Sequence, residues 1–198
     1  MRGKRSGAAR IVVVIGLALA VLAVGCVGPY THIASVRATA NTEKLTELFV
    51  ISQVGSKGEV SPAGFEKTFL QAGTACGIRL AMTHVSRLEL DSHVHVERME
   101  RFGSRYVLTL AEAGGITGAS HWTYYDAKLF DGTPGKLVWR ADVRLSRDGT
   151  LFGDPAERLA MDLLRRLRDD RLIAPCAKLV DPYAAPPAPQ GRETYRRR

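Results

Sequence analysis

The stretch His121–Leu145, HWTYYDAKLFDGTPGKLVWRADVRL, decides the fold because polar and apolar side chains alternate on both sides of a turn-rich segment. Alternation with a period of two indicates strands that bury one face only. The segment Asp131–Lys136 between them contains glycine and proline, which favour a turn. The stretch is therefore expected to form a β-hairpin with one core face and one wet face.

The alternation assigns each hairpin residue to a face. The core face is expected to hold Thr123, Tyr125, Ala127, Leu129, Leu137, Trp139, Ala141, Val143 and Leu145. The wet face is expected to hold Trp122, Tyr124, Asp126, Lys128, Val138, Arg140, Asp142 and Arg144. Opposite charges on neighbouring strands ordinarily form ion pairs. Exposed aromatic residues beside arginines, here Trp122 and Tyr124, are typical of protein interfaces, although a third layer with a covering helix would also explain them.

The flanking sequence predicts further strands and helices in a fixed order. Three strands are expected: one buried on both faces at Leu45–Val54, one at Ile78–Val85 and one at Tyr106–Leu110, which a glycine-bearing loop follows at Glu112–Gly118. Three helices are expected between and after these strands. The first runs from Ser61-Pro62 to Gly77, the second is capped by Asp91 or Ser92, carries Val96, Met99 and Phe102 and ends at Gly103, and the third begins at Asp154-Pro155. Leu159, Leu163 and Leu167 give the last helix an apolar stripe. This order predicts an α+β fold, with a mixed sheet of about five strands and three helices in one domain at residues 45–180.

The N-terminus has the pattern of a bacterial lipoprotein signal. A basic start is followed by an apolar run from Ile11, and Leu22-Ala23-Val24-Gly25-Cys26 is a relaxed match to a lipobox. Residues 1–25 are then a signal peptide, and Cys26 is the lipidation site because a thioether requires a thiol. The alternative, an uncleaved transmembrane anchor, needs about 20 apolar residues, and the run to Gly25 is shorter.

Lipidation would place the protein in the cell envelope. Several acyl chains on one residue anchor stably, and Val27, where Asp would signal inner-membrane retention, favours the periplasmic face of the outer membrane. Residues 26–44 are expected to form a tether with a possible short strand around Ile33–Ala38. Residues 181–198, rich in Pro, Ala and Arg, are expected to be a flexible tail.

Charge and composition exclude nucleic acid as a partner. The chain has a net charge of +8, but four positive charges precede Ile11 and much of the rest lies in residues 192–198, so the intervening part is nearly neutral. A nucleic-acid interface needs a basic face on the fold itself.

Two cysteines remain besides Cys26, namely Cys76 and Cys176. In an oxidising compartment the pair is a possible disulfide, and the alternative is two buried thiols. Each falls just beyond the C-terminal end of an expected helix.

No arrangement typical of a catalytic site stands out, so the protein is expected not to be an enzyme and to need no cofactor. His93 and His95 are weak metal candidates, because zinc or copper requires three or four converging ligands. Solvent-exposed histidines beside a helix cap explain this run equally well.

The second half of the chain resembles a recurring pattern of small bacterial lipoproteins of unknown function. The matching residues are Ala127, Leu129, Asp131, Gly135, Lys136, Val138, Trp139 and Ala141, followed by an amphipathic helix ending near Asp170–Ile173. From Leu45 to Ile173 the pattern looks like the TolB N-terminal domain and the periplasmic part of the curli-secretion lipoprotein. The resemblance implies an envelope component or assembly factor without catalytic residues.

Two functional hypotheses follow. In the first, the protein is a non-catalytic, lipid-anchored envelope lipoprotein that contacts the membrane through its acyl chains and binds another envelope protein. In the second, it is a periplasmic ligand- or metal-binding lipoprotein.

Overall fold

The computed structural model describes residues 31–38, 43–55, 60–86, 93–116, 122–132, 135–146 and 154–179. The expected signal peptide, Cys26, the caps Asp91 and Ser92, and the tail at 181–198 lie outside these ranges. Within them, no helix combines the length and apolar character that crossing a bilayer requires.

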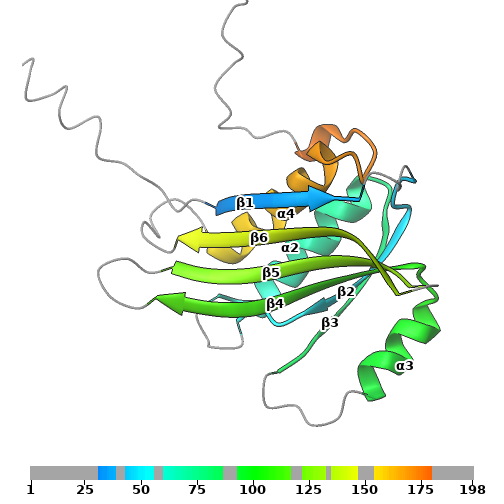
Figure 1. Cartoon of the computed structure of the whole chain (residues 1–198), viewed down its shortest axis with the longest axis horizontal. Helices are drawn as coiled ribbons and strands as arrows, with labels where there is room; N and C mark the ends of the chain where they lie inside the picture. Colours follow the sequence, from blue (N-terminus) through cyan, green and yellow to red (C-terminus); the bar gives the residue numbers. More distant parts are fainter. Residues whose placement is uncertain are drawn as a thin grey trace, which may run out of the picture.

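The described residues form an α+β domain built on one mixed sheet (Figure 1). Its elements are β1 Thr31–Arg37, β2 Glu47–Ser52, α2 Pro62–Ala75, β3 Arg79–His84, α3 His93–Phe102, β4 Tyr106–Ile116, β5 Trp122–Asp131, β6 Lys136–Ser146, α4 Pro155–Asp169 and a 3-10 helix at Ala177–Leu179. The strand order is β1-β6-β5-β4-β2-β3. Strand β2 runs parallel to β3 and β4, and the other pairs are antiparallel. The predicted fold class is confirmed, with six strands instead of about five.

The additional strand is β1, which confirms the short strand suggested around Ile33–Ala38 and lies within the tether expected at 26–44. It pairs with β6 along its whole length, from Thr31 opposite Leu145 to Arg37 opposite Trp139. The sheet therefore begins before residue 45, and β1 is one of its edges.

Helices α2 and α4 begin as the sequence predicts. The Ser61 hydroxyl accepts a hydrogen bond from the backbone N–H of Gly64 at 3.1 Å, and a carboxylate oxygen of Asp154 accepts one from Ala156 N–H at 2.8 Å. In each case proline follows the cap, where its missing N–H costs nothing. Just after α2, Gly77 has a φ of 80°, a conformation that favours glycine.

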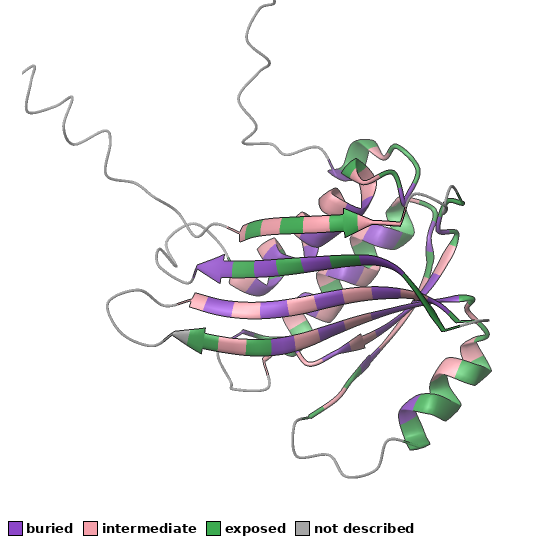
Figure 2. Ribbon diagram, in the orientation of Figure 1, coloured by how far each residue is buried: buried purple, intermediate pink, exposed green. Residues whose placement is uncertain are grey.

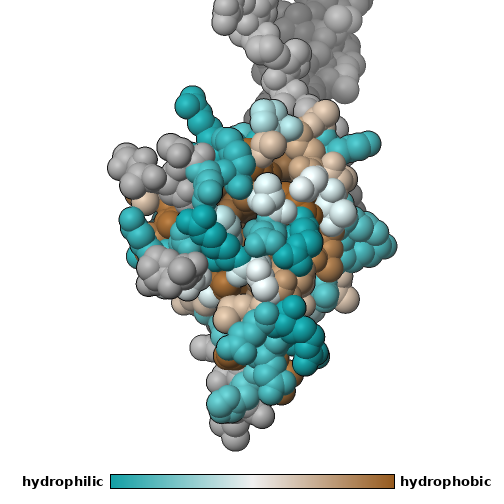
Figure 3. Space-filling model, turned by 90° about the vertical axis from the view of Figure 1, so that its right-hand side faces the viewer, coloured by the Kyte–Doolittle hydropathy of each residue, from teal (hydrophilic) through white to brown (hydrophobic). Residues whose placement is uncertain are grey.

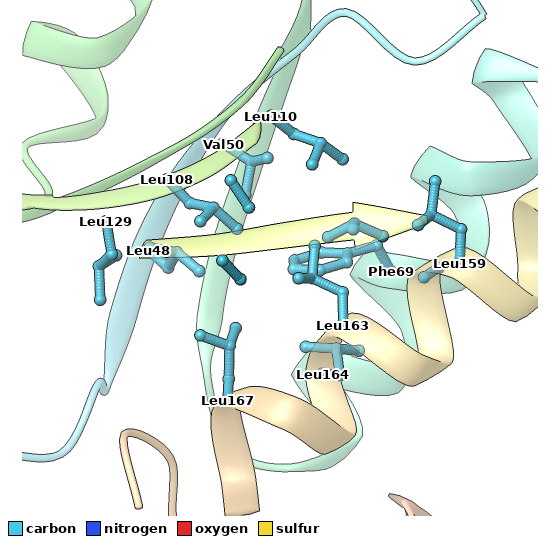
Figure 4. Packing of buried hydrophobic residues seen from close by; sticks show 14 of the residues in the cluster. Leu48, Val50, Phe69, Leu108, Leu110, Leu129, Leu159, Leu163, Leu164 and Leu167 are labelled. Atoms are coloured by element: carbon cyan, nitrogen blue, oxygen red, sulfur yellow. The ribbon is translucent and has the colours of Figure 1, made fainter. Parts of the chain in front are cut away.

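The hydrophobic core lies between one face of the sheet and helices α2 and α4 (Figure 4). The leucine stripe of α4 is fully buried against α2 residues and the inward-facing strand residues. These buried side chains include Leu48, Val50, Phe69, Leu108, Leu110, Leu129, Leu159, Leu163, Leu164 and Leu167. Burial of about 1.5–3 kcal/mol per large apolar side chain makes this layer the main source of stability.

The hairpin β5–β6 has the predicted faces except at one end. Along β5, buried and half-buried residues alternate without interruption (Figure 2). On β6, Leu137 is 42% exposed and Val138 is buried, contrary to the predicted alternation. The cause is a register shift, because Leu129 pairs with Trp139 whereas Phe130 pairs with Leu137, leaving Val138 as an extra residue.

Strand β4 is longer than predicted and replaces most of the loop expected at Glu112–Gly118. Its pairing with β5 continues to Ile116 opposite Trp122, with an irregularity between Glu112 and Gly114. Gly114 has a φ of 142°, which lets the strand continue past this bulge.

Helix α3 lies on the opposite face of the sheet from α2 and α4, against β2 and β3. The rings of Phe49 and Phe102 are 5.9 Å apart, and Arg79 lies over the Phe102 ring. The buried face of α3 differs from the prediction, because Val96 is 43% exposed and His95 is buried.

A cluster of charged residues lies at the end of the domain where β4 begins. Arg105 donates two hydrogen bonds from Nε to the Asp131 carboxylate, at 3.1 and 3.2 Å, and pairs with Glu43. Arg79 and Glu47 form a neighbouring ion pair. Hydrophilic residues predominate on this side of the molecule (Figure 3).

The carboxylate of Asp170, the C-cap of α4, joins that helix to two strands. Its Oδ2 accepts hydrogen bonds from Trp139 Nε1 at 2.7 Å, from Arg166 Nε at 3.2 Å and from the hydroxyl of Ser35. Its backbone carbonyl also accepts a hydrogen bond from the guanidinium of Arg37, at 2.7 Å.

Replacing Trp139 tests this packing. Trp139 is 1% exposed, and its loss would leave a cavity between β6 and α4. We expect Trp139→Ala to lower the free energy of unfolding by about 3–5 kcal/mol in urea titrations. Trp139→Phe, which keeps a ring but removes the N–H, should cost less. A Trp139→Ala protein that unfolds at nearly the parental urea concentration would contradict the assigned faces.

Candidate functional site

The candidate site is the face of β1, β6 and β5 that points away from α2 and α4. We call it the open face, because no helix among the described residues covers it. The sequence left open the explanation that a helix covers Trp122 and Tyr124. The structure does not support this explanation, because α3 packs only against β2 and β3.

A hollow lies at one end of the open face. It has a volume of about 370 Å³ and is lined by His32, Trp122, Tyr124 and Arg144. Strand pairing brings these residues together, because His32 and Tyr124 lie on either side of Arg144 in the sheet. The guanidinium carbon of Arg144 is 5.9 Å from the centre of the Tyr124 ring, within reach of a cation–π interaction.

The middle of the open face carries ion pairs. Asp126 accepts a hydrogen bond from Arg140 Nε at 3.1 Å and pairs with Lys128 Nζ at 2.5 Å. Burial opposes the ionisation of Asp126, but the hydrogen bond and charge of Lys128, reinforced by Arg140, outweigh it and lower the pKa of Asp126. Asp126 therefore forms a cross-strand ion pair with Arg140 on β6 and a second ion pair with Lys128 on its own strand, β5. The cross-strand pair is the structural role expected for these residues.

Toward the other end, the open face carries two exposed apolar side chains beside Arg140. Val36 on β1 is 76% exposed, and Leu137 on β6 is 42% exposed beside Phe130, its partner on β5. Exposed apolar side chains next to paired charges are typical of surfaces that bind other proteins.

The cysteine pair lies away from the open face. Cys76 follows α2 and Cys176 follows α4, and the two are joined by a disulfide with their Cα atoms 5.4 Å apart. The two helices run in parallel, because Gly64 near the start of α2 lies close to Asp154 at the start of α4. The disulfide closes a separation of 100 residues.

The two histidines of α3 do not converge on one point. His95 is buried, and its Nδ1 lies 2.7 Å from the hydroxyl of Thr83 on β3, whereas His93 is exposed. The expectation that both are solvent-exposed is therefore wrong for His95, which packs α3 onto the sheet. Among the described residues, no three His, Cys, Asp or Glu side chains are grouped to hold a metal ion.

Sequence reasoning missed His32 as a member of the site. The sequence signal for His32 is weak, because the segment THIASVR at 31–37 is only seven residues long, and the alternation of exposed and half-buried side chains is correspondingly short. Arg144 was placed on the correct face, but its position between His32 and Tyr124 depends on the pairing of β1 with β6.

The chain was compared with known proteins at the level of sequence and of structure. No protein-family model matches it, and neither does any curated protein. Similar solved structures include the PelC dodecamer from Paraburkholderia phytofirmans, with 16% identity and a TM-score of 0.47, covering 74% of this chain and 100% of PelC. TolB from Acinetobacter baumannii has 11% identity and a TM-score of 0.32, covering 68% of this chain and 29% of TolB. Lipoprotein GNA1162 from Neisseria meningitidis has 15% identity and a TM-score of 0.30, covering 64% of this chain and 96% of GNA1162.

TolB, which the sequence pattern resembles, is thus among these structural neighbours. At such identities the likenesses concern the fold alone, and the function has to be inferred from the chain's own residues.

The lowered pKa of Asp126 gives a test of the ion pairs. A carboxyl group with a depressed folded-state pKa contributes stability above its ordinary value of 3.8 and loses that contribution as the pH falls through the folded-state pKa. We expect the parent to lose more unfolding free energy than Asp126→Asn between about pH 6 and about pH 3 in urea titrations.

Asp142→Asn is the matched control, because the Asp142 side chain is 74% exposed and lies 3.6 Å from Arg140. This variant should follow the parent across the same pH range. Equal pH dependence in the parent and in Asp126→Asn would show that the Asp126 pairs contribute nothing.

Proposed function

We propose that this protein is a non-catalytic, lipid-anchored component of the cell envelope that binds another envelope protein through the open face. The observation that carries the proposal is the uncovered face itself. One side of the same sheet is sealed by α2 and α4, while Val36 and Leu137 remain exposed on the other. Leaving such side chains in water forgoes burial energy that a bound partner would recover.

Anchoring at Cys26 is the second part of the proposal and rests on the lipobox pattern. The Cys76–Cys176 disulfide supports the envelope location that anchoring would require, because structural disulfides persist in oxidising compartments such as the periplasm. Val27 in place of Asp favours the outer membrane as the destination.

Lipidation is tested by Cys26→Ser. We expect the parent to incorporate labelled fatty acid and to run as a processed protein, and the variant to stay as an unlabelled precursor. Gly25→Ala, which keeps a small residue before the thiol, serves as a control that should still be labelled. Labelling and normal processing of Cys26→Ser would remove the anchor from the proposal.

Partner binding is tested by site-specific photo-crosslinking in intact cells. A crosslinking amino acid at Val36 or Leu137 should yield a discrete product of higher mass, whereas one at Lys67, exposed on α2, should not. Introducing Val36→Glu should reduce the product formed from Leu137, because a charge would then be buried in the interface. Equal products from all three positions would contradict a specific partner on the open face.

A further inference from the structure

The hollow on the open face lies at the end of the sheet nearest to Cys26 along the chain. Strands β1 and β5 begin at this end and β6 finishes there, so that His32, Trp122 and Arg144 all lie close to strand ends (Figure 1). The apolar residues Val36 and Leu137 lie toward the opposite end of the same face.

The chain length from the anchor limits how far the hollow can be from a membrane. His32 is only six positions after Cys26 in the chain. A fully extended chain of that length spans about 20 Å, roughly half the thickness of a bilayer with its headgroups. With Cys26 acylated, as proposed above, the hollow therefore stays within reach of the headgroup layer.

The chemistry of the hollow fits a phosphate at a lipid surface. Tryptophan and tyrosine have amphipathic rings that are enriched where a bilayer meets water. The Arg144 guanidinium has donors whose spacing matches phosphate oxygens. In the described part of the chain no carboxylate pairs with Arg144, in contrast to Arg140 and Lys128, which are both paired with Asp126.

We propose that the hollow formed by His32, Trp122, Tyr124 and Arg144 binds the phosphate-bearing headgroups of the membrane that holds the acyl chains of Cys26. The tether makes this contact intramolecular, so that even a weak headgroup interaction is populated. The contact orients the domain with the hollow against the bilayer and presents Val36 and Leu137 away from it. The inference rests on the proposed lipid anchor and adds a second membrane contact to it.

The two tryptophans provide the test. Trp122 is half-buried in the hollow, whereas Trp139 is 1% exposed beneath the opposite face. The full-length lipidated protein is reconstituted into vesicles of phosphatidylethanolamine and phosphatidylglycerol that carry a spin label on the headgroup. We expect part of the tryptophan fluorescence to be quenched. Trp122→Phe should abolish this quenching, and Trp139→Phe should preserve it.

A second pair of variants tests the phosphate. Arg144→Gln should lose most of the quenching, while Arg140→Gln, which alters a paired arginine on the same face, should retain it. Vesicles made of a galactolipid without phosphate should likewise give little quenching. Unchanged quenching in Arg144→Gln, or equal quenching in the galactolipid, would overturn the proposed phosphate contact.

Vesicle flotation separates this inference from the anchor itself. A parent protein that floats with the vesicles but shows no quenching of Trp122 is anchored and has no headgroup contact, which overturns the inference alone. A parent protein that carries no fatty acid and does not float overturns the anchor and the inference together.

Discussion

The rest of the structure depends on how the carboxylate of Asp170 ties α4 to the edge of the sheet. One oxygen accepts hydrogen bonds from Trp139, Arg166 and Ser35, which belong to β6, α4 and β1. A half-buried carboxylate is costly unless such donors surround it, and the buried Trp139 N–H would lose this acceptor without it. The Asp170 carboxylate therefore fixes the C-terminal end of α4 against β1 and β6, while the buried leucine stripe holds the helix over the core.

Local patterns predicted most of the fold because the determinants are local. Ser61-Pro62 and Asp154-Pro155 begin helices because a capping side chain is followed directly by proline. In β5 the alternation of polar and apolar residues matches the alternation of half-buried and buried side chains. The errors arose where pairing overrides periodicity. The extra residue Val138 turned Leu137 outward. The short strand suggested around Ile33–Ala38 did form, but its place at the edge of the sheet depends on β6, more than 100 residues later.

The candidate site was predictable in part for the same reason. Trp122 and Tyr124 were placed on the wet face by alternation, but nothing in their neighbourhood says whether a helix lies over them. That depends on both long helices packing on the other side. His32 joins the hollow through a partner strand far away in the sequence, and His95 is buried because Thr83 on β3 lies opposite it. Such contacts between distant residues leave no periodic trace.

The disulfide between Cys76 and Cys176 has a consequence for biogenesis. Its two ends are 100 residues apart, and the second lies beyond α4, after every strand of the sheet. The crosslink cannot form until nearly the whole domain has been synthesised, and β1 must likewise wait for β6. High contact order of this kind slows folding. The chain therefore cannot complete its fold until late in its synthesis. A polypeptide must be unfolded in this way to pass through a narrow translocation channel.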